Sequence, residues 1–234
     1  MRLDKFLCDT LNIVRTEAKK MVSSGRVTVD DIKAKSGSQQ LSEEAKVCLD
    51  GAPLTYQRYF YIMLNKTAGV VCANRDSKSK TVFDLLDKED LKKDLFVCGR
   101  LDKDTTGFVL ITDDGDFAHR ILSPKNHIFK TYIAGLQHEL SDEDIKSLEN
   151  GITLGDGTVL KEAKVEVIEG DKPFVRIMIC EGKYHQVKRM FAATGNKVVS
   201  LHRLKMGQLQ LDDSLKPGEC REITPEELIL VTEK

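Results

Sequence analysis

Long apolar segments are missing from this chain of 234 residues. No hydrophobic stretch approaches the roughly 18 residues that a membrane-spanning helix needs, and the amphipathic, charged N-terminus is unlike a secretion signal. The overall composition, with 41% hydrophobic and 31% charged residues, is typical of a globular protein in water. We therefore expect a cytoplasmic protein that does not enter a membrane.

Closely spaced cysteines are missing as well. The six cysteines include no Cys-x-x-Cys pair and lie far apart, at positions 8, 48, 72, 98, 180 and 220. Structural zinc sites and thioredoxin-like redox sites depend on close spacing, so neither is supported. His185 and His202 have no acidic or thiolate partner at ligand spacing. We expect reduced, mostly buried thiols and no metal site.

The chain also lacks an excess of positive charge. Its 36 lysines and arginines and 37 acidic residues give a formal net charge of −1. The distribution is uneven, because residues 183–205 contain six basic residues and no acidic one, whereas acids gather at 139–149 and 219–233. A local basic surface is sufficient for binding a nucleic acid, so this class of partner is not excluded.

Two segments of the chain differ in their pattern. In residues 1–58, apolar residues recur at helical spacing over two short stretches, and the second ends at Gly25. The opposite surface of these helices is basic, a feature that more often marks an ordinary solvated surface than a binding site. From Tyr59 the sequence becomes rich in strand patterns. The length suits a small domain at 1–58 followed by a larger one at 59–234.

The most informative stretch is an acidic, glycine-flanked loop at 99–107 that leads into the apolar run Phe108–Ile111. This pattern predicts a polar loop on a buried strand, a common location for chemistry. The simplest interpretation is a solvated turn whose Asp and Thr side chains bind nearby amides. A second is a calcium loop, because five residues fit the EF-hand template: Asp102, Asp104, Thr106, Gly107 and Asp113. That template also needs an entering helix and a terminal glutamate, which this stretch lacks.

A third interpretation is a catalytic carboxylate. Arg100 and Leu101 precede Asp102, and Lys103 follows it. Positive charge and apolar bulk around one acid keep it ionised and poorly hydrated, which suits a nucleophile. The residues of the loop alone leave all three interpretations open.

The surrounding motifs resemble those of the RsuA-type pseudouridine synthases, which modify ribosomal RNA. The resemblance rests on Gly99-Arg100-Leu101-Asp102, on Thr105-Thr106-Gly107 and on residues 110–115. In that family the aspartate of the Arg-Leu-Asp triplet is the essential nucleophile, and the resemblance gives this role to Asp102. It leaves the other acids nearby as turn or capping residues: Asp104, Asp113 and Asp114.

Two further motifs supply partners for Asp102. Residues 182–191 resemble a family motif in which the residue at the position of Lys188 pairs with the nucleophile. Lys188 also lies at the edge of a helical stripe that predicts core packing, formed by Tyr184, Val187, Met190, Phe191 and Thr194. Lys130-Thr131-Tyr132 resembles the element that stacks a tyrosine on the target base, although a lone tyrosine in a strand is more often a core residue. The resemblance thus implies catalytic roles for Tyr132 and Lys188.

Basic residues at other family positions are expected to contact RNA. The first fifty or so residues resemble the small RNA-binding domain that a ribosomal protein shares with many RNA-modifying enzymes. Arg100 is expected to occupy the space left when the target base is flipped out of its stack. The full set of expected RNA-binding residues is Arg2, Arg15, Lys19, Lys20, Arg26, Lys66, Arg100, Arg120, Lys130, Arg189 and Arg203.

The resemblance implies an α+β protein, in which a small α-L, ribosomal-protein-like RNA-binding domain precedes a mixed, mostly antiparallel catalytic domain. The implied enzyme is a monomer that converts a specific uridine of small-subunit ribosomal RNA, naked or in its assembling particle, to pseudouridine. No cofactor or metal is required, because the reaction involves neither redox change nor phosphoryl transfer. Two alternatives stay open: a related enzyme that acts on large-subunit or transfer RNA, and a non-catalytic RNA-binding or ribosome-assembly protein.

Overall fold

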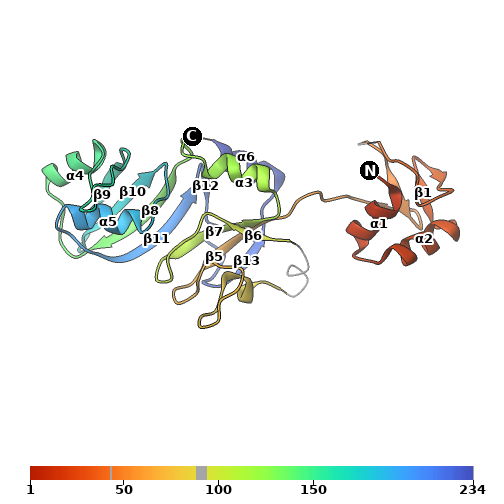
Figure 1. Ribbon diagram of the computed structural model, residues 1–234, viewed down its shortest axis with the longest axis horizontal. Helices are drawn as coiled ribbons and strands as arrows, with labels where there is room; N and C mark the ends of the chain where they lie inside the picture. The colour runs from red at the N-terminus through yellow and green to blue at the C-terminus, as the bar shows by residue number, and fades with distance from the viewer. Residues whose placement is uncertain (43, 88–93, 234) are drawn as a thin grey trace. The chain divides into compact units, whose positions relative to one another are not determined.

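Figure 1 shows the computed structural model, which describes residues 1–42, 44–87 and 94–233. The chain forms two compact units, Met1–Arg58 and Tyr59–Lys234, and each is described by itself. Within the described ranges, no helix is both long and apolar enough to cross a membrane.

Unit 1 (Met1–Arg58) packs two helices against a small antiparallel sheet with the strand order β2-β1-β3-β4. Its elements are α1 (Leu3–Leu11), α2 (Arg15–Ser23), β1 (Val27–Val29), β2 (Ile32–Lys33), β3 (Val47–Leu49) and β4 (Ala52–Leu54). Apolar residues three to four positions apart turn inward, so that Leu3 and Leu7 of α1 and Ala18 and Val22 of α2 are buried in one core. The two helices expected from the spacing of apolar residues are therefore confirmed.

Unit 2 (Tyr59–Lys234) is built on one large sheet. In its described residues nine strands pair in the order β13-β5-β7-β11-β8-β10-β9, with β12 beside β11 and β6 beside β7. The β7–β11 pair is parallel, and the other pairs of this sheet are antiparallel. The expected α+β class with a mixed, mostly antiparallel sheet is confirmed. The strands are β5 (Tyr61–Lys66), β6 (Phe96–Cys98), β7 (Thr106–Thr112), β8 (Lys130–Leu136), β9 (Lys164–Ile168), β10 (Phe174–Ile179), β11 (Val198–Met206), β12 (Leu209–Gln210) and β13 (Cys220–Glu222).

Helices cover both faces of this sheet. They are the 3-10 helix η1 (Val82–Leu85), α3 (Gly115–Leu122), α4 (Asp142–Glu149), α5 (Gln186–Ala193) and α6 (Pro225–Thr232). Phe108 and Leu110 of β7 face a core that α3 and α6 share, and Figure 1 shows these helices side by side. Val109 and Ile111 face a second core that includes side chains of α4 and α5. Burial of β7 on both faces explains why its sequence is continuously apolar instead of alternating.

The acidic loop 99–105 enters β7 next to a position where only glycine fits. Gly107 has a φ of +99°, and a Cβ there would lie 2.3 Å from the carbonyl oxygen of Arg203 and 2.8 Å from its nitrogen. The absent side chain lets β11 lie parallel to the start of β7, with His202 opposite Thr106. This close approach fixes the end of the loop against β11.

The calcium-loop interpretation is wrong, because its residues lie at opposite ends of one strand. Asp102 and Asp104 precede β7, whereas Asp113 follows it. Seven extended residues separate the two ends by about 20 Å, so one ion cannot bind both. Asp114 instead begins α3 by accepting a hydrogen bond from the Phe117 N–H at 2.9 Å, which confirms its expected capping role.

Candidate active site

Arg203, a buried residue of β11, bonds to the start of the loop 99–105 and to the strand that follows the loop. Its guanidinium donates to the carbonyl oxygen of Gly99 at 2.9 Å and to that of Phe108 at 2.6 Å. Arg203 is only 2% exposed, so water does not weaken these charge-assisted bonds. The start of the loop and the strand β7 that continues it are therefore both tied to β11.

Lys66, the last residue of β5, holds the middle of the same loop. Its ammonium donates to the carbonyl oxygens of Lys103 at 3.2 Å and Thr105 at 2.7 Å. Lys66 is fully buried, and this burial lowers its pKa from the ordinary value. These hydrogen bonds hold the loop backbone in place, and the side chains of Asp102 and Asp104 extend from it.

Asp102 extends from this loop toward the segment that begins α5. Lys188 Nζ lies 3.0 Å from one carboxylate oxygen, and His185 Nε2 lies 3.4 Å from the other. The Asp102 side chain retains 25% exposure, so it is sheltered and still accessible. A cation at this distance stabilises the ionised carboxylate by about 1–4 kcal/mol, depending on how much water screens the pair. The arrangement supplies an accessible carboxylate with a cation directly beside it.

Lys188 also binds a second carboxylate, that of Asp104, at 2.6 Å. Burial alone would lower the pKa of Lys188, but its bonds to Asp104 and Asp102 outweigh burial and raise that pKa. The hydrogen bond from Lys188 lowers the pKa of Asp104. Lys188 therefore stays protonated and Asp104 stays ionised at neutral pH. The expectation that Asp104 serves only the turn is wrong, because its carboxylate is the nearest partner of Lys188.

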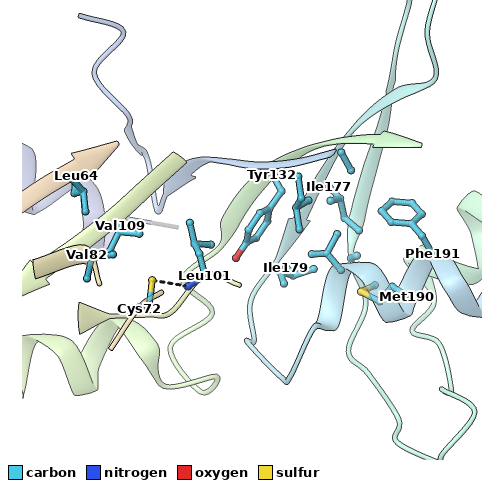
Figure 2. Close-up of a cluster of buried hydrophobic side chains, with 14 of the residues drawn as sticks. Leu64, Cys72, Val82, Leu101, Val109, Tyr132, Ile177, Ile179, Met190 and Phe191 are labelled. Carbon is cyan, nitrogen blue, oxygen red and sulfur yellow. Dashed lines mark hydrogen bonds between the residues drawn. The ribbon is translucent and has the colours of Figure 1, made fainter. Parts of the chain in front are cut away.

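Tyr132, in β8, lines the same pocket as Asp102, Lys188 and Arg100. Figure 2 shows its ring within the cluster of buried apolar side chains, on the side that faces Leu101. The Leu101 N–H donates a 3.3 Å hydrogen bond to the sulfur of Cys72, which holds Leu101 in place. The Tyr132 ring is thus both a core residue and part of the pocket wall. The structure brings together all three residues expected to be catalytic.

One residue of the pocket wall, Thr105, carries a buried hydroxyl group that has no partner among the described residues. Thr105 Oγ1 is buried, and it makes no hydrogen bond within the described part of the chain. The backbone N–H of Thr105 donates to the carbonyl oxygen of Asp102 at 3.1 Å, which fixes the residue beside the acid. Leaving a buried hydroxyl unpaired costs about 1–3 kcal/mol, so such groups are rare without a reason. The hydroxyl is enclosed by protein in this structure and is not open to the pocket.

The pocket encloses only about 70 Å³. Pockets that hold complete small-molecule ligands typically measure about 300–1,000 Å³. The pocket can therefore take a small part of a large substrate, and the rest must lie outside it. In the described ranges, no three His, Cys, Asp or Glu side chains are grouped so as to hold a metal ion.

The sequence of unit 2 matches a known family model. Residues 60–193 match RNA pseudouridylate synthase, and residues 1–52 match the S4 domain. The chain belongs to the RNA pseudouridylate synthase family. The protein is therefore a pseudouridine synthase, an isomerase, and the pocket around Asp102 is its candidate active site.

Relatives of this synthase match along its whole length. The ribosomal small subunit pseudouridine synthase A of Vibrio cholerae is 47% identical over 229 residues, which cover 97% of this chain and 98% of that protein. The uncharacterized RNA pseudouridine synthase YtzG of Bacillus subtilis is 45% identical over 236 residues, covering 100% of this chain and 99% of that protein. A pseudouridylate synthase of known crystal structure is 42% identical, with a TM-score of 0.69 and 99% of both chains covered. The RsuA-type resemblance expected from the motifs is confirmed.

Three basic residues that were expected to contact RNA are buried in the synthase unit. Lys66, Lys130 and Arg203 are 0%, 5% and 2% exposed. Lys66 and Arg203 support the loop, and Lys130 Nζ donates to the carbonyl oxygen of Ile128 at 3.0 Å. An RNA phosphate cannot reach these cations, so the expectation is wrong for all three.

We expect Lys66→Met to reduce turnover without weakening RNA binding. The variant leaves loop carbonyls unpaired, which costs about 1–3 kcal/mol of folding free energy and loosens the backbone under Asp102. Lys130→Met is the matched control, because its bonded carbonyls lie away from the loop. Chemical denaturation should show that both variants are destabilised, whereas the rate of pseudouridine formation should fall only for Lys66→Met. Weaker RNA binding by Lys66→Met would contradict the assignment.

The other expected RNA-binding residues of unit 2 are accessible to different degrees. Arg100 is exposed and lines the pocket. Arg120 is exposed, with its guanidinium 5.7 Å from the centre of the Phe117 ring. Arg189 is half-buried and pairs with Asp156 at 2.5 Å. RNA can reach Arg100 and Arg120 directly, whereas Arg189 would first have to leave its carboxylate.

In the S4 unit, the expected RNA-binding residues lie on the surface. Arg15, Lys19 and Lys20 of α2 are exposed. Arg2 and Arg26 are half-exposed, and each guanidinium pairs with a carboxylate, that of Asp4 at 2.7 Å or Asp50 at 2.5 Å. Arg2 and Arg15 also line a cavity of about 620 Å³ with the aromatic rings of Phe6 and Tyr56. RNA binding by these residues stays a prediction.

Three residues in or beside the pocket have positions that the sequence did not predict. His185 contacts Asp102, and Thr105 carries the buried hydroxyl. Tyr184 was expected in the buried stripe of a helix, but it is 72% exposed, so that expectation is wrong. The cause is the start of α5 at Gln186, which leaves Tyr184 on the preceding turn. A strong apolar stripe predicts the helix well and its first residue poorly.

Proposed function

We propose that the protein converts one uridine of small-subunit ribosomal RNA to pseudouridine, namely uridine 516 of the 16S RNA, the target that the RsuA-type resemblance implies. The observation that carries the catalytic part is the 3.0 Å ion pair between Asp102 and Lys188 inside the pocket. The choice of RNA is supported by similarity to the small-subunit synthases of Vibrio cholerae and Yersinia pestis, at 47% and 46% identity. We also propose that the enzyme acts as a monomer, with Asp102, Tyr132 and Lys188 supplied by the same chain.

The reaction replaces the bond between a base nitrogen and the ribose with a bond between a base carbon and the ribose. The uracil must detach, turn and reattach without escaping into water. Asp102 acts on the ribose as nucleophile or proton acceptor, and Lys188 holds the carboxylate in position through their 3.0 Å ion pair. Tyr132 supplies the flat, apolar wall against which the base turns. The small volume of the pocket keeps the detached base beside the sugar.

The target base must leave its stack before it reaches Asp102. Enzymes that act on a base extrude the nucleotide into their pocket and pay a few kcal/mol for unstacking. Arg100 is exposed and borders the pocket, so its guanidinium can fill the space that the base vacates. The bonds from Arg203 to the start of this loop hold the Arg100 backbone in place.

Neutralising the exposed cations of α2 should weaken RNA binding and make it less sensitive to salt. We expect the triple variant Arg15→Gln, Lys19→Gln, Lys20→Gln to reduce the slope of log affinity against log salt by about 2, since each lost phosphate contact removes about 0.7–0.9. At saturating RNA its turnover should match the wild-type rate, because the cleft around Asp102 is unchanged. Filter binding at several salt concentrations measures the slope. An unaltered slope would contradict the role given to the S4 unit.

Carbodiimide mapping of pseudouridine tests the proposed function. The wild-type protein is incubated separately with unmodified small-subunit RNA, large-subunit RNA and transfer RNA, and with a partly assembled small-subunit particle. We expect one new reverse-transcription stop, in the small-subunit RNA or its particle. A stop confined to large-subunit or transfer RNA would reassign the substrate. Bound RNA without any stop would make the chain a non-catalytic binding protein.

A further inference from the structure

An exposed pair of aromatic rings stands beside the pocket. The Tyr184 and His185 rings stack with their centres 3.8 Å apart and their planes 18° apart. His185 covers one face of the Tyr184 ring, and with 72% of Tyr184 exposed, the other face is open to solvent. His185 Nε2 is in turn 3.4 Å from the Asp102 carboxylate. The stack therefore leads from the carboxylate outward to an uncovered aromatic face.

The backbone that carries this pair is braced. The buried side chain of Gln186 accepts a hydrogen bond from the Lys183 N–H at 2.9 Å. Arg189 donates to the carbonyl oxygen of Tyr184 at 3.4 Å. His185 has a φ of +47°, which non-glycine residues seldom adopt and which concentrates at functional sites. The Tyr184 ring is thus held outward before any ligand arrives, which lowers the entropic cost of binding to it.

The path of the RNA explains why a ring is useful at this place. The pocket of about 70 Å³ admits only part of the substrate, so the nucleotides that adjoin the target must lie on its rim. Among residues 182–188, all described, Tyr184 alone does not line the pocket, which places it outside the wall that its neighbours form. Lys183 and Arg100 are exposed and line the pocket, so they bring positive charge to this rim. Proteins that bind single-stranded nucleic acids combine a basic track with exposed aromatic rings on which bases stack.

We propose that Tyr184, backed by His185, is a stacking platform for one unpaired nucleobase that flanks the target uridine. The proposal rests on the proposed RNA substrate and adds a second base-binding position, outside the pocket that Tyr132 lines. Any of the four bases can occupy it, because every base has a flat π-face. The platform therefore positions the strand and contributes affinity, and it does not read the sequence.

The test combines variants of Tyr184 with RNA substrates that lack a single base. The substrate is a small-subunit RNA fragment in which each of the nucleotides flanking the modified uridine is replaced, one at a time, by an abasic residue. We expect Tyr184→Ala to lower kcat/KM by about tenfold or more, mainly through KM, and Tyr184→Phe to stay near the wild-type value. For the wild-type protein, one abasic position should lower kcat/KM by a similar factor. At that position Tyr184→Ala should lose nothing further.

A fluorescent variant reads the stack without turnover. The chain contains no tryptophan, so Tyr184→Trp introduces a single indole and retains a stacking surface. Binding of the intact fragment should quench its emission, and the fragment with the sensitive abasic position should not. This measurement decides the case even if Tyr184→Ala folds poorly.

The outcomes separate this proposal from the proposed function. A wild-type value of kcat/KM for Tyr184→Ala would overturn the stacking platform and leave the synthase assignment intact. The same holds if, at every abasic position, the loss of kcat/KM from the variant multiplies the loss from the abasic residue. Quenching that is equally strong with all abasic fragments would overturn it too. If the wild-type protein modifies no uridine of the fragment while modifying another RNA, the substrate assignment fails instead, and the same series is read on that RNA.

Discussion

Asp102→Asn is expected to bind RNA as tightly as the wild-type protein and to form no detectable pseudouridine. The amide has nearly the same shape as the carboxylate, so the pocket and the loop beneath it should keep their geometry. It carries no charge, however, and can neither attack the ribose nor accept its proton. Loss of such a group costs about 10²–10⁴-fold where only proton transfer is affected, and more where a covalent step is lost. Single-turnover assays at saturating RNA measure the rate, and filter binding measures the affinity.

Stability must be checked in the same variant. Lys188 keeps its 2.6 Å contact with Asp104 when Asp102 loses its charge, so we expect the midpoint of thermal unfolding to change little. An inactive variant that also fails to fold would reveal nothing about chemistry. Turnover at the wild-type rate in a folded Asp102→Asn protein would show that another group reacts with the nucleotide.

Lys188→Met is expected to have the second-largest effect. It leaves Asp102 without its 3.0 Å cation partner and removes about 1–4 kcal/mol of stabilisation from the ionised carboxylate. Turnover should therefore fall by about 5- to 1,000-fold. The apolar side chain of methionine has a similar length, so packing along α5 should be retained. The rate constant under single-turnover conditions is again the relevant quantity.

Lys188→Arg is the matched control for this variant. It preserves the positive charge but changes the shape of the donor, so most of the activity should remain. Full activity in Lys188→Met would show that Asp102 needs no cation. Equal losses in the two variants would show that the geometry of the ammonium group matters and its charge does not.

The sequence predicted those elements whose signal is local. The apolar run Phe108–Ile111 indicated a buried strand, and two-sided burial of β7 explains why the run is continuous. Asp114 was expected to be a turn or capping residue, and it begins α3. The parallel contact between β7 and β11 joins residues about a hundred positions apart. The position of Gly107 in the sequence does not reveal that the backbone of Arg203 lies against it.

The sequence did not predict which basic residues are buried. A lysine that binds backbone carbonyls inside the protein has the same local pattern as a lysine on the surface. Lys66 is buried because it binds carbonyl oxygens of a loop some forty positions away in the sequence. Arg203 is buried because both the loop and β7 pack against its strand, β11. The partners that decide burial are distant in sequence, so spacing and charge clusters could not reveal them.

Tyr132 shows how two competing interpretations can both be correct. A tyrosine in a strand is most often a core residue, and Tyr132 is indeed only 8% exposed. Its ring nevertheless lines the pocket with Asp102. The meeting of Asp102 and Lys188, which come from a loop and a helix 86 positions apart, was expected from the family motifs and not from local patterns.

The most direct test compares the two carboxylates that Lys188 binds. We claim that Asp102 reacts and that Asp104, 74% exposed, only helps to hold Lys188. Loss of such an exposed pair costs about 1 kcal/mol or less, so Asp104→Asn should stay within about fivefold of the wild-type rate. Single-turnover rate constants of Asp102→Asn and Asp104→Asn at saturating RNA are the measurement. We predict no pseudouridine from the first variant and near-normal formation by the second; the reverse order would show that Asp104, and not Asp102, reacts with the nucleotide.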